Sequence, residues 1–149
     1  GSTQNRIPAG KLKNGGTSAA VLSELVKRLI EHLGQWCIEK VILSKQPDFI
    51  EKNQIILDAD KVGNIVLRYW KAGDRFSPRG INGSKKLARV MRDLHISAGE
   101  RRIWPLVADE NHIYWIAFLR GSNYGLPDKN TKKYLLITLK KENREDEES

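Results

Sequence analysis

The sequence is short of the residues from which disulfides, metal centres and membrane spans are built. Its 149 residues include a single cysteine, Cys37, which excludes an internal disulfide. The three histidines are scattered, without the spacing of a metal site. No apolar run approaches the ~18 residues that a membrane span needs, and no signal peptide opens the chain. We therefore expect a cytoplasmic protein without membrane attachment or metal.

Catalytic constellations are equally scarce. No Ser-His-Asp, Cys-His or paired-carboxylate arrangement can be defended from the residue order. Asp58 and Asp60 follow an apolar run, where such a pair is typical of a turn. His95 follows a helical pattern and is expected to cap the C-terminal end of that helix. The sequence therefore predicts no catalytic residue in this chain.

Positive charge is what the sequence has in excess. The formal net charge is +8, although the last eight residues carry five acids and one arginine. Residues 68–102 hold ten Lys and Arg against three acids, which gives this segment a net charge of +7. A field of this kind attracts phosphate backbones and accelerates encounter with them. A solvated surface is the commoner origin of such charge, but its concentration in one segment favours nucleic-acid binding.

The hydrophobic pattern divides the chain into four parts. Residues 1–18 are polar, begin with a Gly-Ser tag scar, and are predicted to be a flexible lead-in. Residues 19–33 have apolar positions at helical spacing and predict an amphipathic helix that ends at Gly34. Residues 34–141 are expected to form one folded domain. Residues 142–149 are expected to be an acidic, disordered tail.

Within the domain, β-rich segments alternate with short helical ones. Three segments, QWCIEKVIL, NQIILDA and NIVLRYW, have the branched and aromatic content of strands. Ser97 and Glu100 fit a capping box that opens a short helix. Asp109–Asn111 separates two apolar runs and predicts a hairpin, and residues 134–139 predict the last strand. This order predicts an α+β fold, a compact layered β-sheet or sandwich-like domain with short helices and a core that contains Trp104 and Trp115.

The segment GDRFSPRGINGSKKLARVM, residues 73–91, raises a choice between two phosphate-binding devices. A nucleotide P-loop needs four residues between its glycines and then Gly-Lys-Ser/Thr. Gly80 is only three residues before Gly83, and Ser-Lys-Lys follows. The spacing and the order both exclude a P-loop.

A basic helix fits the same segment better. Over residues 84–94 the apolar side chains of Leu87, Val90, Met91 and Leu94 share one face, and Ser84 is predicted to cap the first turn. The opposite face then carries four cations within roughly 120°. Two arginines from the preceding turn extend this group. The predicted nucleic-acid contacts are therefore Arg75, Arg79, Lys85, Lys86, Arg89 and Arg92.

Several short motifs together resemble the C-terminal domain of the bacterial tRNA(Ile)-lysidine synthetases. They are LDADK (57–61), LRYWKAGDRFSPRGINGSKKL (67–87), HISAGERRIWPLV (95–107) and IYWIAFLR (113–120). The resemblance covers residues 34–140. Three departures stand out: Ser97-Ala98 replaces a Pro-containing helix entry, Ala117-Phe118 replaces a Pro-Gly turn, and 121–124 replaces an Arg-Ile-Asp stretch.

The resemblance implies a fold, a substrate and a partner. The fold would be a layered β domain related to one in phenylalanyl-tRNA synthetase. Full-length members of the family are ligases that use ATP to join lysine to the wobble cytidine of tRNA(Ile). ATP, magnesium and lysine would bind an N-terminal catalytic domain whose SGGxDS loop is absent from this chain. The chain would be inactive alone and would bind tRNA(Ile) on its acceptor-stem side, next to that domain, in a protein whose assembly as a homodimer stays open.

Two further functions stay open at the level of sequence. The basic segment could dock on an acidic partner or on another domain of the same protein, as a protein-interaction module. A stand-alone enzyme is a third class, but no constellation of residues supports it.

Overall fold

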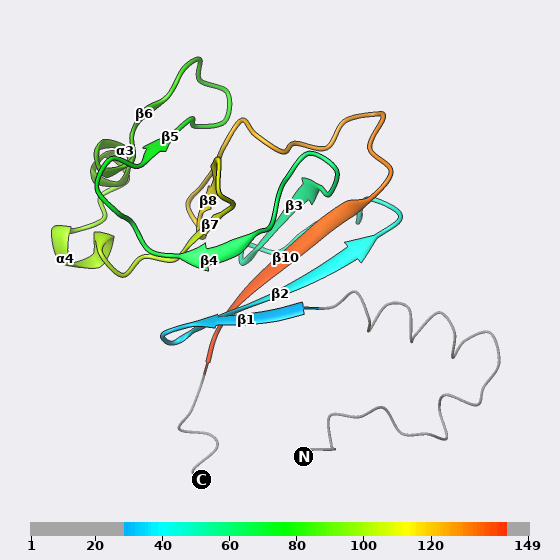
Figure 1. Cartoon of the computed structure of the whole chain (residues 1–149), viewed down its shortest axis with the longest axis horizontal. Coiled ribbons are helices and arrows are strands. Elements are labelled where there is room, and N and C mark those ends of the chain that lie inside the picture. Colours follow the sequence, from blue (N-terminus) through cyan, green and yellow to red (C-terminus); the bar gives the residue numbers. More distant parts are fainter. Residues whose placement is uncertain (1–28, 143–149) are drawn as a thin grey trace, which may run out of the picture.

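Two four-stranded antiparallel sheets and a small helical layer make up the structure. The computed structural model describes residues 29–142 (Figure 1). Sheet A has the order β1-β2-β10-β3, formed by Leu29–Leu33, Trp36–Leu43, Tyr134–Lys141 and Gln54–Asp58. Sheet B has the order β4-β7-β8-β9, formed by Val66–Arg68, Leu106–Ala108, Ile113–Ile116 and Arg120–Gly121. The third layer holds β5 (Arg75–Phe76), β6 (Lys85–Lys86), α3 (Leu87–Asp93) and α4 (Ala98–Arg101).

Sheet B is the middle layer, and its short strands have two buried faces. Every residue of β7 and β8 is buried. Val107 and Trp115 pack into the cluster shared with sheet A, whereas Leu106 and Ile116 pack into the cluster beneath α3. Alternate residues of a strand point to opposite faces, so these two strands join both cores. The hairpin predicted at Asp109–Asn111, between β7 and β8, is confirmed, as is the core position of Trp115.

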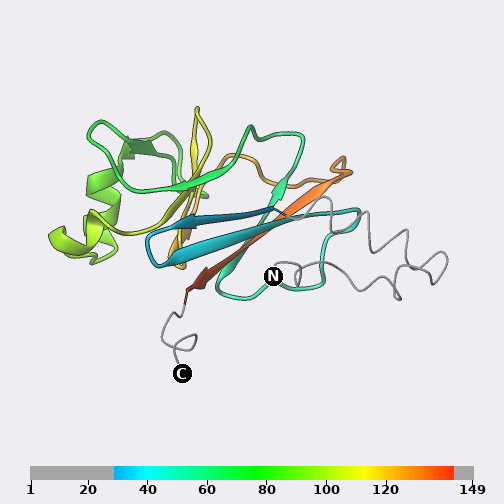
Figure 2. The same ribbon diagram turned by 60° about the horizontal axis from the view of Figure 1, so that its bottom comes forward.

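Sheet A packs on sheet B through one face only, so buried and partly exposed residues alternate along its strands. In β10, Leu135, Ile137 and Leu139 are buried while the residues between them are partly exposed. The buried set packs against Trp115 and Tyr114 of β8. Figure 2 shows sheet A lying along one side of sheet B. The predicted α+β layered fold is therefore confirmed. Residues 29–142 include no apolar helix of membrane-spanning length.

The predicted amphipathic helix over residues 19–33 is wrong where the structure describes it. Residues 29–33 form β1, and residues 19–28 lie outside the described part. Gly34 adopts a φ of +59° in a two-residue turn that pairs Leu33 with Trp36. A glycine at the first turn position suits a tight hairpin, because it tolerates positive φ. The edge of β2 thus competes successfully with the local helical preference.

One buried lysine ties sheet A to the start of sheet B. Lys40 in β2 is 5% exposed, and its Nζ donates to the backbone oxygen of Ile65 at 2.7 Å and to Glu31 Oε2 at 2.9 Å. Glu31 belongs to β1, so the strand that replaced the predicted helix supplies the counter-charge. A buried charge is tolerated when it is paired and hydrogen-bonded in this way.

The second correction concerns the start of the basic helix. Lys85 and Lys86 are extended in β6, paired with Phe76 and Arg75, and α3 begins at Leu87. Ser84 does not cap α3, because Arg75 Nε donates to Ser84 Oγ at 2.9 Å and Arg75 Nη2 to the Ser84 backbone oxygen at 3.0 Å. The Leu87 N–H donates to the Asp74 backbone oxygen at 2.9 Å and continues this pairing. Strand pairing with β5 therefore replaces the first predicted helical turn.

The other local predictions for this layer, and one for the turn that follows β3, are confirmed. Leu87, Val90 and Met91 are buried, and Leu94 is partly buried against the same cluster. The Ser97–Glu100 capping box is formed in both directions. His95 takes a φ of +65° after α3, and its N–H donates to the Arg92 oxygen, as a C-terminal cap does. Asp58 accepts the Asp60 N–H within a turn, and Trp104 Nε1 donates to the Ala117 oxygen at the margin of the core.

Candidate nucleic-acid interface

All six predicted contact residues lie in the third layer and are exposed to solvent. Arg75 belongs to β5, Arg79 to the loop that follows it, Lys85 and Lys86 to β6, and Arg89 and Arg92 to α3. We call these six residues the basic face. Figures 1 and 2 both place the β5–β6 ribbon and α3 at one end of the molecule. The structure places the six residues in one layer, but only Arg89 and Arg92 are helical.

The register of the ribbon divides the two lysines. Residues directly opposite each other in an antiparallel pair share a face, and neighbours along a strand alternate. Lys86 lies opposite Arg75 and shares its outer face. Lys85 lies opposite the buried Phe76 and borders a small hollow beside Val90 and Leu94. The basic face is therefore a curved surface and not one helix face.

None of the six side chains forms an ion pair with an acid among residues 29–142. Elsewhere in the described chain, Lys40, Lys61 and Arg68 are each paired to a carboxylate at 2.8–2.9 Å. Asp74 lies beside the basic face, but Arg68 holds it with hydrogen bonds of 2.9 and 3.1 Å. Within residues 29–142 the cations of the basic face are therefore left without an ion-pair partner.

The ionisation of Asp74 follows from its partners. Burial of the carboxyl opposes ionisation, but hydrogen bonds from the Arg68 side chain and the Lys71 backbone outweigh this. The pKa of Asp74 is consequently held below its ordinary value. Asp74 thus stays charged and stays with Arg68, and it orders the 71–74 turn that leads into β5.

Asn123 holds the loop between β5 and β6 in shape. Its Nδ2 donates to the backbone oxygens of Pro78 at 2.9 Å and Ile81 at 2.8 Å, and its Oδ1 accepts the Gly80 N–H at 2.8 Å. Ser77 adds a hydrogen bond from its Oγ to the Gly83 oxygen at 2.9 Å. A single amide therefore satisfies three backbone groups of an exposed loop. We call these contacts the Asn123 clamp.

Arg79 is positioned by the chain that runs beside the loop. Its N–H donates to the Gly121 oxygen at 3.0 Å, and Arg120 Nη2 donates to the Arg79 oxygen at 2.9 Å. A Cβ on Gly121 would lie 2.8 Å from Arg79 Nη2, so a side chain there would displace the guanidinium. The 121–124 segment thus supports Arg79 and the loop between β5 and β6. Sequence reasoning missed Gly121 and Asn123 because nothing local signals contacts with residues 77–83.

The structure also accounts for the conformation at Ala117-Phe118. Phe118 takes a φ of +68°, a conformation that favours glycine. Its ring packs at centroid distances of 5.6 Å from Trp36 and 6.0 Å from Trp115. Contact with these two rings offsets the cost of positive φ.

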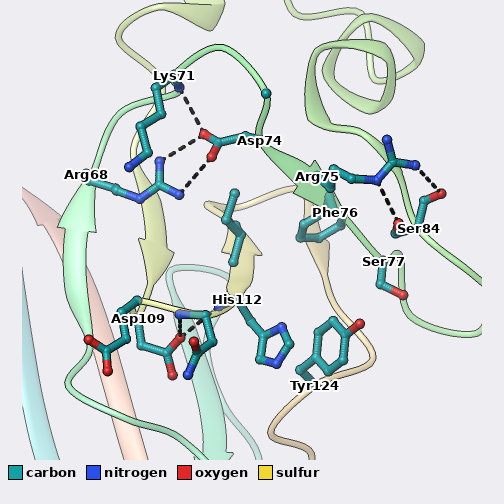
Figure 3. Close-up of a pocket in the computed structure, with 14 residues that line it drawn as sticks. Arg68, Lys71, Asp74, Arg75, Phe76, Ser77, Ser84, Asp109, His112 and Tyr124 are labelled. Atoms are coloured by element: carbon teal, nitrogen blue, oxygen red, sulfur yellow. Dashed lines mark hydrogen bonds and ion pairs between the residues drawn. The ribbon is translucent and has the colours of Figure 1, made fainter.

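A cleft of about 340 Å³ lies beside the basic face (Figure 3). It is bordered by the 68–77 segment, Ser84, the 109–113 segment and Tyr124. Asp109 at its base accepts hydrogen bonds from three N–H groups at 2.8 Å and from the Tyr114 hydroxyl at 2.6 Å. Burial opposes ionisation of Asp109, but these four bonds lower its pKa, and burial with the same Asp109 contact raises the pKa of Tyr114. In the described residues no group of three His, Cys, Asp or Glu could hold a metal ion.

Comparison with known proteins gives the domain a family. Residues 65–137 match the family model described as TilS substrate C-terminal domain. The tRNA(Ile)-lysidine synthase of Caldanaerobacter subterraneus subsp. tengcongensis is 40% identical over 115 residues, which cover 76% of this chain and 25% of that protein. The tRNA(Ile)-lysidine synthase of Clostridium acetobutylicum is 40% identical over 92 residues, 61% of this chain and 20% of that protein.

A solved structure has the same fold. The crystal structure of a TilS C-terminal domain superposes with a TM-score of 0.66 and 24% identity, covering 77% of this chain and 92% of that one. The chain spans about a quarter of the length of the curated relatives it matches. The matched segment contains all of sheet B, the basic face and Asn123. These findings together show that the chain belongs to the family of the TilS substrate C-terminal domain.

Proposed function

We propose that this domain binds tRNA(Ile) on its acceptor-stem side, as the substrate-recognition domain of a tRNA(Ile)-lysidine synthetase. The observation that carries the proposal is the basic face, six exposed cations with no acidic partner among the described residues. Lys40, Lys61 and Arg68, by contrast, are each paired with a carboxylate. Unpaired cations gathered on one layer are suited to an external polyanion.

The shape of the basic face suits duplex RNA better than a single phosphate. Arg89 and Arg92 are three residues apart on α3 and lie on the same side of the helix. Arg75 and Lys86 form a second pair on the outer face of the ribbon. Duplex RNA is recognised mainly through its shape, its phosphates and its 2′-hydroxyls, and this needs several cations along a surface.

The reaction belongs to the full-length protein under this proposal. The relatives that share this domain are tRNA(Ile)-lysidine synthases, of which this chain matches about a quarter. ATP-dependent joining of lysine to the wobble cytidine, with bound ATP, magnesium and lysine, would take place in a catalytic domain outside this chain. The present domain would hold the far end of the tRNA for that domain in the cytoplasm. The chain alone is expected to be inactive.

Titration of the chain with tRNA(Ile) at two salt concentrations tests the proposal. Phosphate contacts release counterions, so the affinity should fall steeply as salt rises. Lys140→Ala removes an exposed charge on sheet A, where the ammonium lies 3.8 Å from Glu39, and serves as the control outside the basic face. Absence of binding at low salt, or binding that salt does not affect, would reject tRNA recognition. Cross-linking of the basic face to protein and not to RNA would instead favour a protein-interaction module.

A further inference from the structure

The cleft beside the basic face carries an exposed aromatic pair that lies outside both hydrophobic core clusters. The rings of His112 and Tyr124 stack with centroids 3.8 Å apart and an interplanar angle of 15° (Figure 3). Both residues are exposed, Tyr124 by 38%, and neither belongs to a hydrophobic core cluster. Tyr114 provides the contrast, because it is 1% exposed and packed in the core.

Tyr124 forms a wall between two hollows. It borders the cleft together with His112, and it borders an adjoining hollow formed by Ser77, Asn123 and residues 80–84. His112 lines the cleft but not the adjoining hollow. His112 stacks on one face of the phenol ring, and Tyr124 also borders the hollow on the side of the loop. A flat ring that enters there would find an aromatic surface.

The backbone around Tyr124 is fixed before any ligand binds. The Tyr124 N–H donates to Ser122 Oγ at 3.0 Å, and the preceding residue forms the Asn123 clamp. Gly125 follows with a φ of +69°, and a Cβ there would lie 2.9 Å from Val62 Cγ1. A platform that is already ordered loses little conformational entropy when a partner stacks on it.

The charges of the cleft favour a neutral group over a phosphate. Its lining includes three cations, Arg68, Lys71 and Arg75, and three acids, Asp74, Asp109 and Glu110. Arg68 is committed to Asp74, and Asp109 is satisfied by four donors. The exposed Ser84 hydroxyl and the His112 imidazole add donors and acceptors of the kind that a base edge uses. A phosphate would find a more positive surface next to the cleft, where Arg75 and Lys86 share a face.

We propose that Tyr124, backed by His112, is a stacking platform for an unpaired RNA nucleotide that continues the duplex held by the basic face. The proposal rests on the function proposed above and adds a single-stranded subsite to it. The nucleobase stacks on Tyr124 while its phosphate lies near Arg75. Stacking of this kind tolerates any base, because every base has a π face.

Two RNA hairpins test the platform with the whole chain. One ends in a blunt duplex, and the other carries a short single-stranded 3′ extension on the same duplex. The parent chain should bind the extended hairpin roughly five- to hundredfold more tightly. Tyr124→Ala and Tyr124→Leu should lose this preference and bind the blunt hairpin as the parent does. Tyr124→Phe should keep the preference, because the ring is retained.

Controls separate this inference from the proposed function. Phe49→Ala removes a ring that is 74% exposed, far along the chain from the cleft, and should keep the preference. A fluorescent base analogue at the first unpaired position should be quenched by the parent and not by Tyr124→Leu, whose melting temperature confirms folding. Equal affinity of the parent for both hairpins, or an unchanged preference in both Tyr124→Ala and Tyr124→Leu, overturns the platform and leaves duplex binding intact. Failure of both hairpins to bind at low salt overturns the proposed function as well.

Discussion

Cations are used in opposite ways in two regions of this domain. Lys40 and Arg68, in sheets A and B, are each held by a carboxylate and by a backbone oxygen. The six residues of the basic face have no acidic partner in the described chain, and four of them have no side-chain hydrogen bond either. The domain therefore neutralises charge where it must be buried and leaves it free where an anion can approach.

This difference separates stability from binding. A buried cation without its partner is costly, because it has lost water and gained nothing. An exposed cation costs little to keep and little to remove, since water and salt screen it. Substitutions in the first region should thus change folding, and substitutions in the second should change affinity for RNA.

The largest effect is expected from Lys40→Ala. Loss of the ammonium leaves the Ile65 oxygen and the Glu31 carboxylate without their donor, and the free energy of unfolding should fall by about 2–4 kcal/mol. Urea titration measures this loss. The exposed Lys140→Ala is the control, and its free energy of unfolding should stay close to that of the parent. RNA affinity of the folded fraction should be unchanged. Weakened RNA binding by folded Lys40→Ala would break the division between the two regions.

Removing two cations of the basic face should have the reverse profile. Arg89→Ala combined with Arg92→Ala should lower tRNA affinity by roughly 50-fold near physiological salt and flatten the salt slope by about two units. Folding should change by under about 0.5 kcal/mol for each residue. Leu87→Ala, on the buried face of the same helix, is the control that loses stability first. A double variant with the parent's affinity and salt slope would show that these arginines only solvate the surface.

Asn123→Ala lies between the two cases, because its amide serves both the fold and the basic face. Loss of the clamp should lower the free energy of unfolding by about 1–2 kcal/mol and weaken RNA binding severalfold through the loosened loop. Asn123→Asp should not restore the parent, because a carboxylate can accept the Gly80 N–H but cannot donate to Pro78 and Ile81. Both are read by thermal melting and RNA titration. Full affinity in folded Asn123→Ala would mean that the loop needs no clamp.

The smallest effect is a dependence on pH. The folded-state pKa of Asp109 is lowered, so its contribution to stability is complete above the ordinary carboxyl pKa and is lost as pH falls through the folded value. Stability should be nearly flat between about pH 7 and pH 5 and should decline below about pH 4. Asp109→Asn should reduce the steepness of this decline, although Asp74 adds a decline of the same sign. Acid titrations of melting temperature compare the two proteins.

The sequence predicted those parts of the domain in which local pattern and tertiary structure agree. The apolar face of α3, the capping box at Ser97 and the hairpin at 109–111 each depend on residues a few positions apart. The errors at 29–33 and 84–86 arose because neighbouring strands, β2 and β5, offered pairing that helical spacing of the apolar residues does not reveal.

In the candidate site, too, the features visible in the local sequence were predicted and those that depend on tertiary contacts were not. Composition identified the six cations, because charge is visible without a fold. Asn123 and the His112–Tyr124 stack were missed, since their partners are brought close by the hairpin between β7 and β8 and by the long segment before β10. The residues that organise the interface were therefore less visible in the sequence than those expected to touch RNA.

The Asn123 clamp also sets an order of events during synthesis. Its partners precede it by 42 to 45 positions along the chain. Contacts of such separation form only after the intervening chain has been ordered, because closing a long loop costs entropy before any contact repays it. A chain still emerging from the ribosome, or one damaged within sheet B, would carry every cation of the basic face without the loop geometry that arranges them. Under the proposed function, incomplete molecules would then compete poorly for tRNA with finished ones.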